Sequence, residues 1–259
     1  MLLVVALAVI TLISFLDDDI TIGGIKVKKS PIAKTLREKY LTTEEKQKAE
    51  EIRQEALVQK ARPQENPIDT APQVFLFIGD SMTQNLSIRA AAYAKQNGHK
   101  IHTINWDSSG TRIWAQSDEL DNFIEKYHPT FIFISLGSNE LYIRNLDPYR
   151  EYVRTILKKI GDIPYVWIGP PNWKKDEGIN DMLLEETAPG TFFRSEGIQL
   201  ARKSDQIHPT RDAAVIWFDS VARWIPKSAH PIRLTIPSDS ITKSTKLKDT
   251  NIVYLKAKH

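Results

Sequence analysis

Cysteine is absent from this 259-residue chain, and the formal net charge is only +3. Without cysteine there is no disulfide, no thiolate metal ligand, no cysteine nucleophile and no cysteine to carry an N-terminal lipid. The small net charge gives no reason to expect a nucleic-acid partner. Stretches of the form Gly-x-x-x-x-Gly-Lys or Gly-x-Gly-x-x-Gly are also missing, so nucleotide binding has no support. We therefore expect neither a cofactor nor a metal.

One long apolar run lies at the N-terminus, where residues 2–16 contain only Thr11 and Ser14 as polar residues. A helix of residues 1–16 would span roughly 24 Å, which is less than the bilayer's hydrocarbon core of about 30 Å. A signal peptide is the alternative, although no basic residue precedes the run and no small-x-small cleavage site follows it. We interpret residues 1–16 as an N-terminal membrane anchor or signal segment.

This segment predicts a membrane-anchored protein whose folded domain lies outside the membrane, or a secreted one if the segment is cleaved. Lysines shortly after the run, at positions 26, 28, 29 and 34, favour the opposite orientation under the positive-inside rule. Residues 17–72 are interpreted as a charged helical stalk or linker. Within them, residues 36–62 are rich in Glu, Lys, Arg and Gln and contain neither Gly nor Pro, a composition typical of a solvated helix.

From residue 73 onward, short apolar runs alternate with amphipathic segments. This alternation predicts an α/β fold, a three-layer α/β/α sandwich with a central parallel sheet, over residues 73–225. The expected strands are 74–78, 101–104, 131–136 and 165–168, with a fifth at either 191–194 or 198–201. Residues 226–259 are expected to be a C-terminal extension, with two short strands at 232–236 and 252–254 packed outside the main domain.

Ser81 lies where the first of these strands should turn into a helix. The run 74–78 is followed by Gly79-Asp80-Ser81, and apolar residues at helical spacing follow the serine. Such a corner faces the carboxyl edge of the sheet, where open α/β folds bind ligands. The N–H groups of the helix N-terminus suit a developing oxyanion, although a simple helix cap is the alternative.

His208 is the histidine, among six, whose surroundings suggest a role for it. It follows Asp205 by three residues and directly precedes Pro209 and a capped helix. Asp205 can therefore curl back to the imidazole and fix its tautomer, as the third member of a catalytic triad does. An ordinary loop pair is the alternative reading of this spacing.

Two further loops should open at the same sheet edge as Ser81. One follows the second strand and contains Gly110, and the other, Gly137-Ser138-Asn139-Glu140, follows the third. A glycine N–H and an asparagine amide are donors of the kind an oxyanion hole needs, although both residue types are also common in turns. Three aromatic residues in these edge loops can either stack on a sugar ring or pack the loops: Trp106, Tyr142 and Trp173.

Taken in order, these blocks resemble the SGNH/GDSL hydrolase family. Gly79-Asp80-Ser81 resembles the nucleophile motif, Gly110 the second-block glycine, Gly137-x-Asn139 the third block and Asp205-x-x-His208 the final block. The resemblance covers roughly residues 73–225. It implies a flavodoxin-like sandwich that performs acyl-serine chemistry without a metal.

The resemblance also implies a role for each residue. Ser81 would be the nucleophile, His208 the general base and Asp205 its orienting partner. The backbone N–H groups of Ser81 and Gly110 and the Asn139 side chain would form the oxyanion hole. Asp80 is expected to be structural, and Glu140 to stabilise its loop, with substrate binding as the alternative.

The function implied is a serine esterase that cleaves small acyl esters, acetyl above all, from an acylated carbohydrate. With the N-terminal segment and the charged spacer, the resemblance implies a bacterial cell-envelope location outside the cytoplasmic membrane. The alternatives are an O-acyltransferase acting on a cell-envelope polysaccharide, a lipase or thioesterase of the same family, and a non-catalytic glycan-binding module.

Overall fold

The computed structural model describes residues 20–22, 25–27, 48, 52 and 66–256. The chain divides into two compact units, residues 1–56 and residues 57–259. The predicted anchor, residues 1–16, and nearly all of the predicted helix 36–62 lie outside the described residues. Within the described ranges, no helix is both long enough and apolar enough to cross a membrane.

The predicted stalk, residues 17–72, is not helical throughout. In the first unit, β1 (Ile20–Ile22) pairs antiparallel with β2 (Ile25–Val27). Each strand has the sequence apolar–polar–apolar, and this period of two suits a strand better than a helix. Lys48 and Ile52 are helical, as expected for that part of the stretch.

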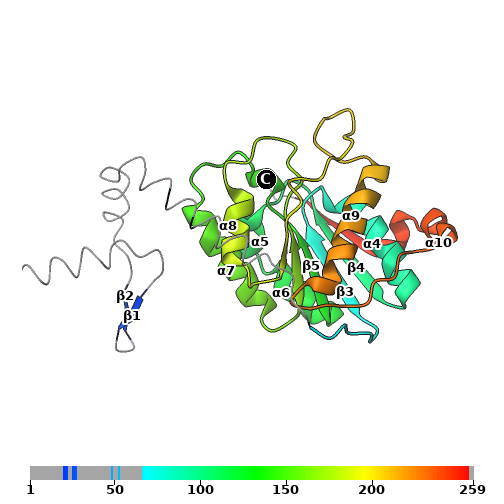
Figure 1. Ribbon diagram of the computed structural model, residues 1–259, viewed down its shortest axis with the longest axis horizontal. Helices are drawn as coiled ribbons and strands as arrows, with labels where there is room; N and C mark the ends of the chain where they lie inside the picture. The colour runs from blue at the N-terminus through cyan, green and yellow to red at the C-terminus, as the bar shows by residue number, and fades with distance from the viewer. Residues whose placement is uncertain (1–19, 23–24, 28–47, 49–51, 53–65, 257–259) are drawn as a thin grey trace, which may run out of the picture. The chain divides into compact units, whose positions relative to one another are not determined.

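A six-stranded parallel sheet forms the centre of the second unit, in the order β7-β6-β5-β3-β4-β8. When β3 to β7 are numbered 1 to 5 in chain order, they lie side by side as 2-1-3-4-5, which is the flavodoxin-like pattern. This order confirms the predicted α/β fold. Figure 1 shows the strands running side by side between helices. The strands are β3 (Val74–Gly79), β4 (Lys100–Trp106), β5 (Phe131–Ser135), β6 (Tyr165–Ile168), β7 (Phe192–Phe193) and β8 (Ile252–Leu255).

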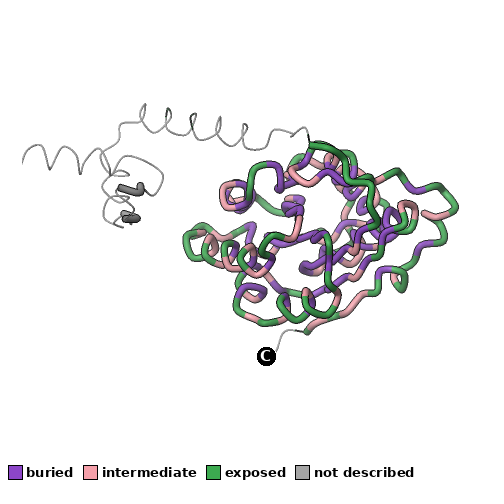
Figure 2. The backbone as a smooth tube through the Cα atoms, turned by 90° about the horizontal axis from the view of Figure 1, so that it is seen from below, coloured by how far each residue is buried: buried purple, intermediate pink, exposed green. Residues whose placement is uncertain are grey.

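Helices cover both faces of this sheet, so its inner strands are buried on both sides. On β3, Phe75 and Phe77 pack toward α4 and α9, whereas Leu76 and Ile78 pack toward α5 to α8. Figure 2 shows the resulting buried interior. The helices are α4 (Thr83–Asn97), α5 (Thr111–Gln116), α6 (Glu119–Tyr127), α7 (Asp147–Ile160), α8 (Ile179–Glu186), α9 (Arg211–Trp224) and α10 (Asp239–Ser244), with short 3-10 turns η1 (Ser138–Glu140), η2 (Ile225–Lys227) and η3 (Leu247–Thr250).

The C-terminal segment differs from its prediction. Instead of packing outside the main domain, β8 joins the central sheet beside β4, with Thr103 opposite Ile252. The Asn251 side chain donates to the Ile101 carbonyl at 2.8 Å and secures the start of this pairing. Of the other expected strand, 232–236, Ile232 forms an isolated bridge with Asp69. An apolar strand pattern predicts pairing, but it does not identify the partner, which here is the free edge of β4.

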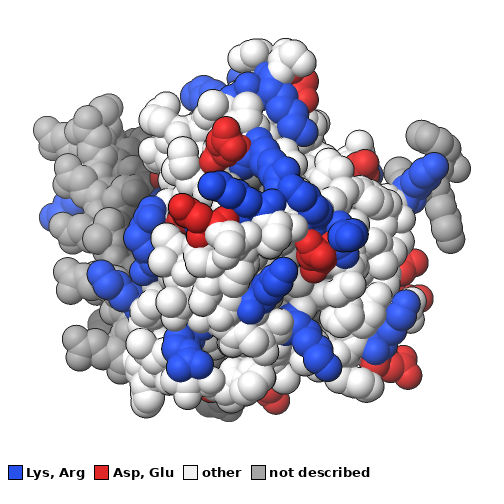
Figure 3. Space-filling model, turned by 90° about the vertical axis from the view of Figure 1, so that its right-hand side faces the viewer, with Lys and Arg blue, Asp and Glu red and all other residues white. Residues whose placement is uncertain are grey.

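Charged side chains lie mainly at the surface, where Figure 3 shows both signs on the side that carries α10. The ion pair between α4 and α9 is an exception. Arg89 Nε donates to Asp219 Oδ1 at 2.7 Å and its Nη2 donates to Oδ2 at 3.0 Å, with only 6% and 15% of the two side chains exposed. Arg89 Nη1 also donates to Thr242 of α10 at 2.7 Å. One guanidinium therefore joins three helices.

Asp219→Ala should lower the free energy of unfolding by roughly 3–5 kcal/mol, because it leaves the buried Arg89 guanidinium without its carboxylate. Glu125→Ala, which removes an exposed carboxylate on α6, is the matched control and should change it by less than about 0.5 kcal/mol. Urea unfolding followed by tryptophan fluorescence measures both values. Equal losses in the two variants would show that the buried pair contributes nothing.

Candidate active site

The structure brings Ser81, His208 and Asp205 into one chain of hydrogen bonds. Ser81 lies between the end of β3 and the start of α4, and its Oγ is 2.8 Å from His208 Nε2. The other ring nitrogen of His208, Nδ1, is 2.8 Å from Asp205 Oδ2. The serine and the histidine are 127 residues apart in sequence, so only the fold can bring them together. A hydroxyl, an imidazole and a carboxylate in this order can move a proton away from the hydroxyl.

The loop before α9 holds this arrangement through its own backbone. Asp205 Oδ1 accepts hydrogen bonds from the backbone N–H groups of Ile207 at 2.8 Å and His208 at 2.9 Å. Together with the stronger bond from the His208 ring, these donors hold the pKa of Asp205 well below its usual range. Asn85 of α4 donates to the Pro209 carbonyl at 3.2 Å, which ties the loop to the helix behind Ser81.

Arg202 is a site residue that the sequence analysis missed. Its Nη1 donates to the carbonyl of Ile207 at 2.7 Å, directly before His208. Its Nη2 donates to the carbonyl of Pro171 at 3.0 Å, in the loop between β6 and α8. The guanidinium therefore fixes the histidine loop to a neighbouring loop. An arginine in a polar loop carries no sequence signal for this role, because both acceptors are backbone carbonyls.

The two predicted oxyanion loops are bonded to each other. Asn139 Nδ2 donates to the Ser109 carbonyl at 2.7 Å, which places this amide beside Gly110. Glu140 Oε1 accepts from the Thr111 backbone N–H at 2.6 Å and from its hydroxyl at 3.1 Å. Glu140 therefore holds the loops together, the structural role expected of it. A Cβ at Gly110 would lie 2.2 Å from Glu140 Oε1, so this position has no room for a side chain.

Parallel pairing brings these loops to the same edge of the sheet. Gly79, at the end of β3, lies opposite Asn105 of β4 on one side and Ser135 of β5 on the other. Among the described residues, no protein acceptor binds the backbone N–H of Ser81 or of Gly110. Both residues, with Asn139 and His208, are partly exposed.

Asp80 is fully buried beside this edge. Its Oδ1 accepts from the Met82 backbone N–H at 2.9 Å, and burial raises the pKa of the carboxyl to about 8. Burial likewise raises the pKa of Glu140. In the described part of the chain, no group of three ligating side chains is placed to hold a metal ion.

The aromatic residues of the edge loops have different environments. Trp106 is the last residue of β4 and is buried in the core, where it packs edge-on against Trp114 of α5 with ring centroids 5.4 Å apart. Tyr142 is 53% exposed. Trp173 is half-buried, and its Nε1 lies 3.1 Å from both the carbonyl and the hydroxyl oxygen of Ser138.

Comparison with known proteins gives only weak likenesses. No family model matches the chain, and no curated protein matches it. A solved structure of a Clostridium thermocellum family 3 carbohydrate esterase is similar, with a TM-score of 0.47, 13% identity and coverage of 59% of this chain and 94% of that chain. A second solved structure has a TM-score of 0.45, 13% identity and coverage of 60% and 98%. Likenesses this weak carry no functional conclusion.

Asp80→Asn should make the protein's stability less dependent on pH. The folded-state pKa of Asp80 is raised from 3.8 to about 8, so the folded protein keeps a proton that the unfolded chain loses. Wild-type stability should therefore fall as pH rises between about 5 and 8, by at most ~1.4 kcal/mol per pH unit from this group. Asparagine keeps the acceptor for Met82 and cannot ionise.

Chemical unfolding at pH 5, 6, 7 and 8 measures the difference between wild type and Asp80→Asn. The free energy of unfolding of the variant should rise relative to that of the wild type with each increase in pH. A difference that stays constant across this range would mean that Asp80 is ionised in the folded protein.

Proposed function

We propose that this chain is a serine esterase that cleaves small acyl esters, acetyl above all, from carbohydrate. The observation that carries the proposal is the chain of hydrogen bonds from Ser81 Oγ through His208 to Asp205, with both distances at 2.8 Å. The resemblance of the sequence blocks to SGNH/GDSL hydrolases supports the same chemistry. The exposed ring of Tyr142 and the half-buried ring of Trp173 support a sugar as the alcohol part of the ester.

In the proposed acylation step, Ser81 Oγ attacks the ester carbonyl carbon while His208 Nε2 takes the hydroxyl proton. Asp205 holds the Nδ1–H tautomer and stabilises the imidazolium that forms. The carbonyl oxygen becomes an oxyanion that accepts from the N–H groups of Ser81 and Gly110 and from the Asn139 amide. When the tetrahedral intermediate collapses, the C–O bond to the sugar breaks and His208 returns the proton to the leaving sugar oxygen.

Deacylation repeats these steps with water as the nucleophile. His208 takes a proton from water, the hydroxide oxygen attacks the acyl carbon, and the Ser81 oxygen leaves with the proton from His208. A sugar hydroxyl in place of water would make the protein an O-acyltransferase. Turnover of acetylated glycans measured with and without an acceptor sugar separates the two outcomes.

A fluorophosphonate probe should label the full-length protein at Ser81, with fluoride as the leaving group. Ser81→Ala should abolish labelling, and His208→Ala should slow it by at least ~10³-fold, because a triad acts as a unit. Asp205→Asn should have a smaller effect, since it disturbs orientation more than proton transfer. Intact-mass spectrometry over time measures the rates. Labelling of the His208 variant at the wild-type rate would refute the triad.

Asn139→Ala should lower kcat on p-nitrophenyl acetate by about 10²–10³-fold with a much smaller change in KM, because an oxyanion donor acts mainly in the transition state. Asn122→Ala is a control, since it removes an exposed amide on α6. An effect of Asn139→Ala on KM alone would make this side chain a ground-state contact instead.

A further inference from the structure

The loop between β6 and α8 contacts the oxyanion side of the site. Trp173 Nε1 lies 3.1 Å from the Ser138 carbonyl oxygen and from its Oγ. Ser138 directly precedes Asn139, whose amide is beside Gly110. The indole ring is therefore fixed next to the residues that would bind the oxyanion.

The same loop also contacts the histidine side of the site. The Pro171 carbonyl accepts from Arg202 at 3.0 Å, and Arg202 also binds the carbonyl before His208. Residues 171–174 thus lie between the two halves of the catalytic arrangement. This segment therefore contacts the loops that carry the Asn139 amide and His208.

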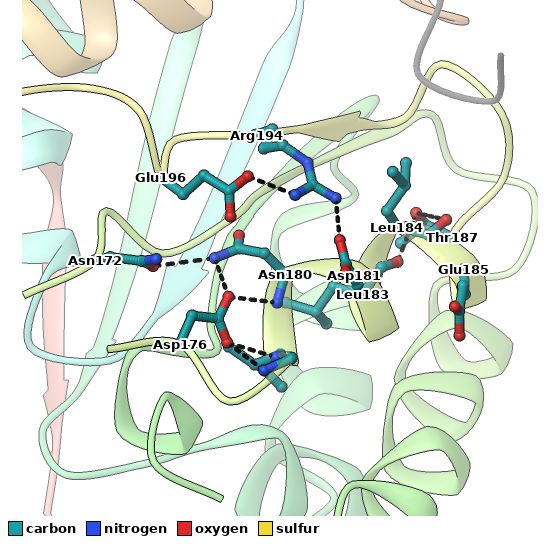
Figure 4. Close-up of polar contacts among 12 residues, drawn as sticks. Asn172, Asp176, Asn180, Asp181, Leu183, Leu184, Glu185, Thr187, Arg194 and Glu196 are labelled. Atoms are coloured by element: carbon teal, nitrogen blue, oxygen red, sulfur yellow. Dashed lines mark hydrogen bonds and ion pairs between the residues drawn. The ribbon is translucent and has the colours of Figure 1, made fainter. Parts of the chain in front are cut away.

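A partly buried polar network holds this loop in place. Asp176 Oδ1 accepts from the backbone N–H groups of Gly178 and Ile179, at 2.7 Å each, at the start of α8. Asp176 Oδ2 accepts from Asn180 Nδ2 at 2.9 Å, and the same amide donates to Asn172 Oδ1 at 3.1 Å, as Figure 4 shows. The loop therefore has fixed ends and offers a preorganised surface.

Lys174 places a cation on the exposed side of this surface. Its Nζ lies 5.1 Å from the ring centroid of Tyr142 and 5.8 Å from that of Trp173, within the range of a cation–π contact. In the described part of the chain, Lys174 makes no ion pair, whereas its neighbour Lys175 binds Glu177 at 3.0 Å. An ammonium held by two rings and lacking a carboxylate partner is suited to an anionic ligand.

We propose that Tyr142, Trp173 and Lys174 form a subsite for a sugar that carries a carboxylate next to the acylated unit. The inference rests on the proposed esterase function and names its substrate class as esters of acidic carbohydrates. The half-exposed ring of Tyr142 offers an apolar face to the sugar C–H groups. Lys174 Nζ supplies the opposite charge to the carboxylate, and the two rings hold this ammonium in position.

Two substrates of the same shape and different charge test the subsite: a disaccharide that links a mono-acetylated sugar to glucuronic acid, and the methyl ester of that disaccharide, with release of acetate as the readout. The wild-type full chain should cleave the free acid with a kcat/KM roughly three to ten times higher, as expected for a partly exposed ion pair. Added salt should reduce this preference, because it screens the charges. The gain should lie in KM, since Lys174 is not expected to act on the reacting atoms.

Lys174→Gln should abolish the preference by lowering kcat/KM for the free acid to the value for the methyl ester. Lys175→Gln removes the same charge one residue away, from a lysine that Glu177 already neutralises, and should keep the preference. Tyr142→Ala should raise KM for both substrates, because each sugar loses its contact with the tyrosine ring. Fluorophosphonate labelling of Lys175→Gln should proceed at the wild-type rate, and far-UV circular dichroism should match the wild type in all three variants.

Equal cleavage of acid and ester by the wild type would overturn the subsite and leave the esterase proposal standing. Loss of the preference in Lys175→Gln as well would also overturn it, since general charge attraction would then explain the result. No cleavage of either compound by a wild type that still reacts with the probe would overturn the proposed substrate and the subsite with it. No reaction with the probe would refute the triad itself.

Discussion

The close approach of chain segments at the end of β3 is the constraint on which the candidate site depends. A Cβ on Gly79 would lie 2.1 Å from Thr83 Oγ1 and 2.4 Å from the Ser135 carbonyl oxygen, so this strand can end here only with glycine. The absence of a side chain lets α4 begin four residues later, with Ser81 in the turn between them. A larger residue would push the turn away from β5 and separate Ser81 from the loop that carries Asn139.

Hydrogen bonds between loops then convert a shared sheet edge into a defined arrangement of groups. Glu140 binds Thr111, Asn139 binds Ser109, and Arg202 joins the histidine loop to the loop after β6. Each bond connects segments that are distant in sequence. Groups fixed in this way need little rearrangement when charge develops on a substrate oxygen, and this preorganisation is the main physical basis of oxyanion stabilisation.

Much of the fold could be predicted from the sequence because its main signals are local. The apolar runs at 74–78 and 131–136 and the helical period of 147–160 indicate buried strands and an amphipathic helix without knowledge of their partners. The alternation of strand and helix then predicts a parallel sheet with right-handed crossovers. The C-terminal strand shows the limit of such signals, since the pattern at 252–255 indicates a strand and β4 decides where it pairs.

The sequence by itself determined the residue types of the candidate site and their order: Ser81 after a strand, Gly110 and Asn139 in edge loops, and Asp205 three residues before His208. Only the tertiary structure decided that Ser81 Oγ and His208 Nε2 lie 2.8 Å apart, that Arg202 binds the Pro171 carbonyl of a neighbouring loop, and that Lys174 lies over the Tyr142 ring. The physical reason is the range of the interactions. Backbone propensities and periodicity act over a few neighbouring residues, whereas these contacts join segments that meet only when the sheet has formed.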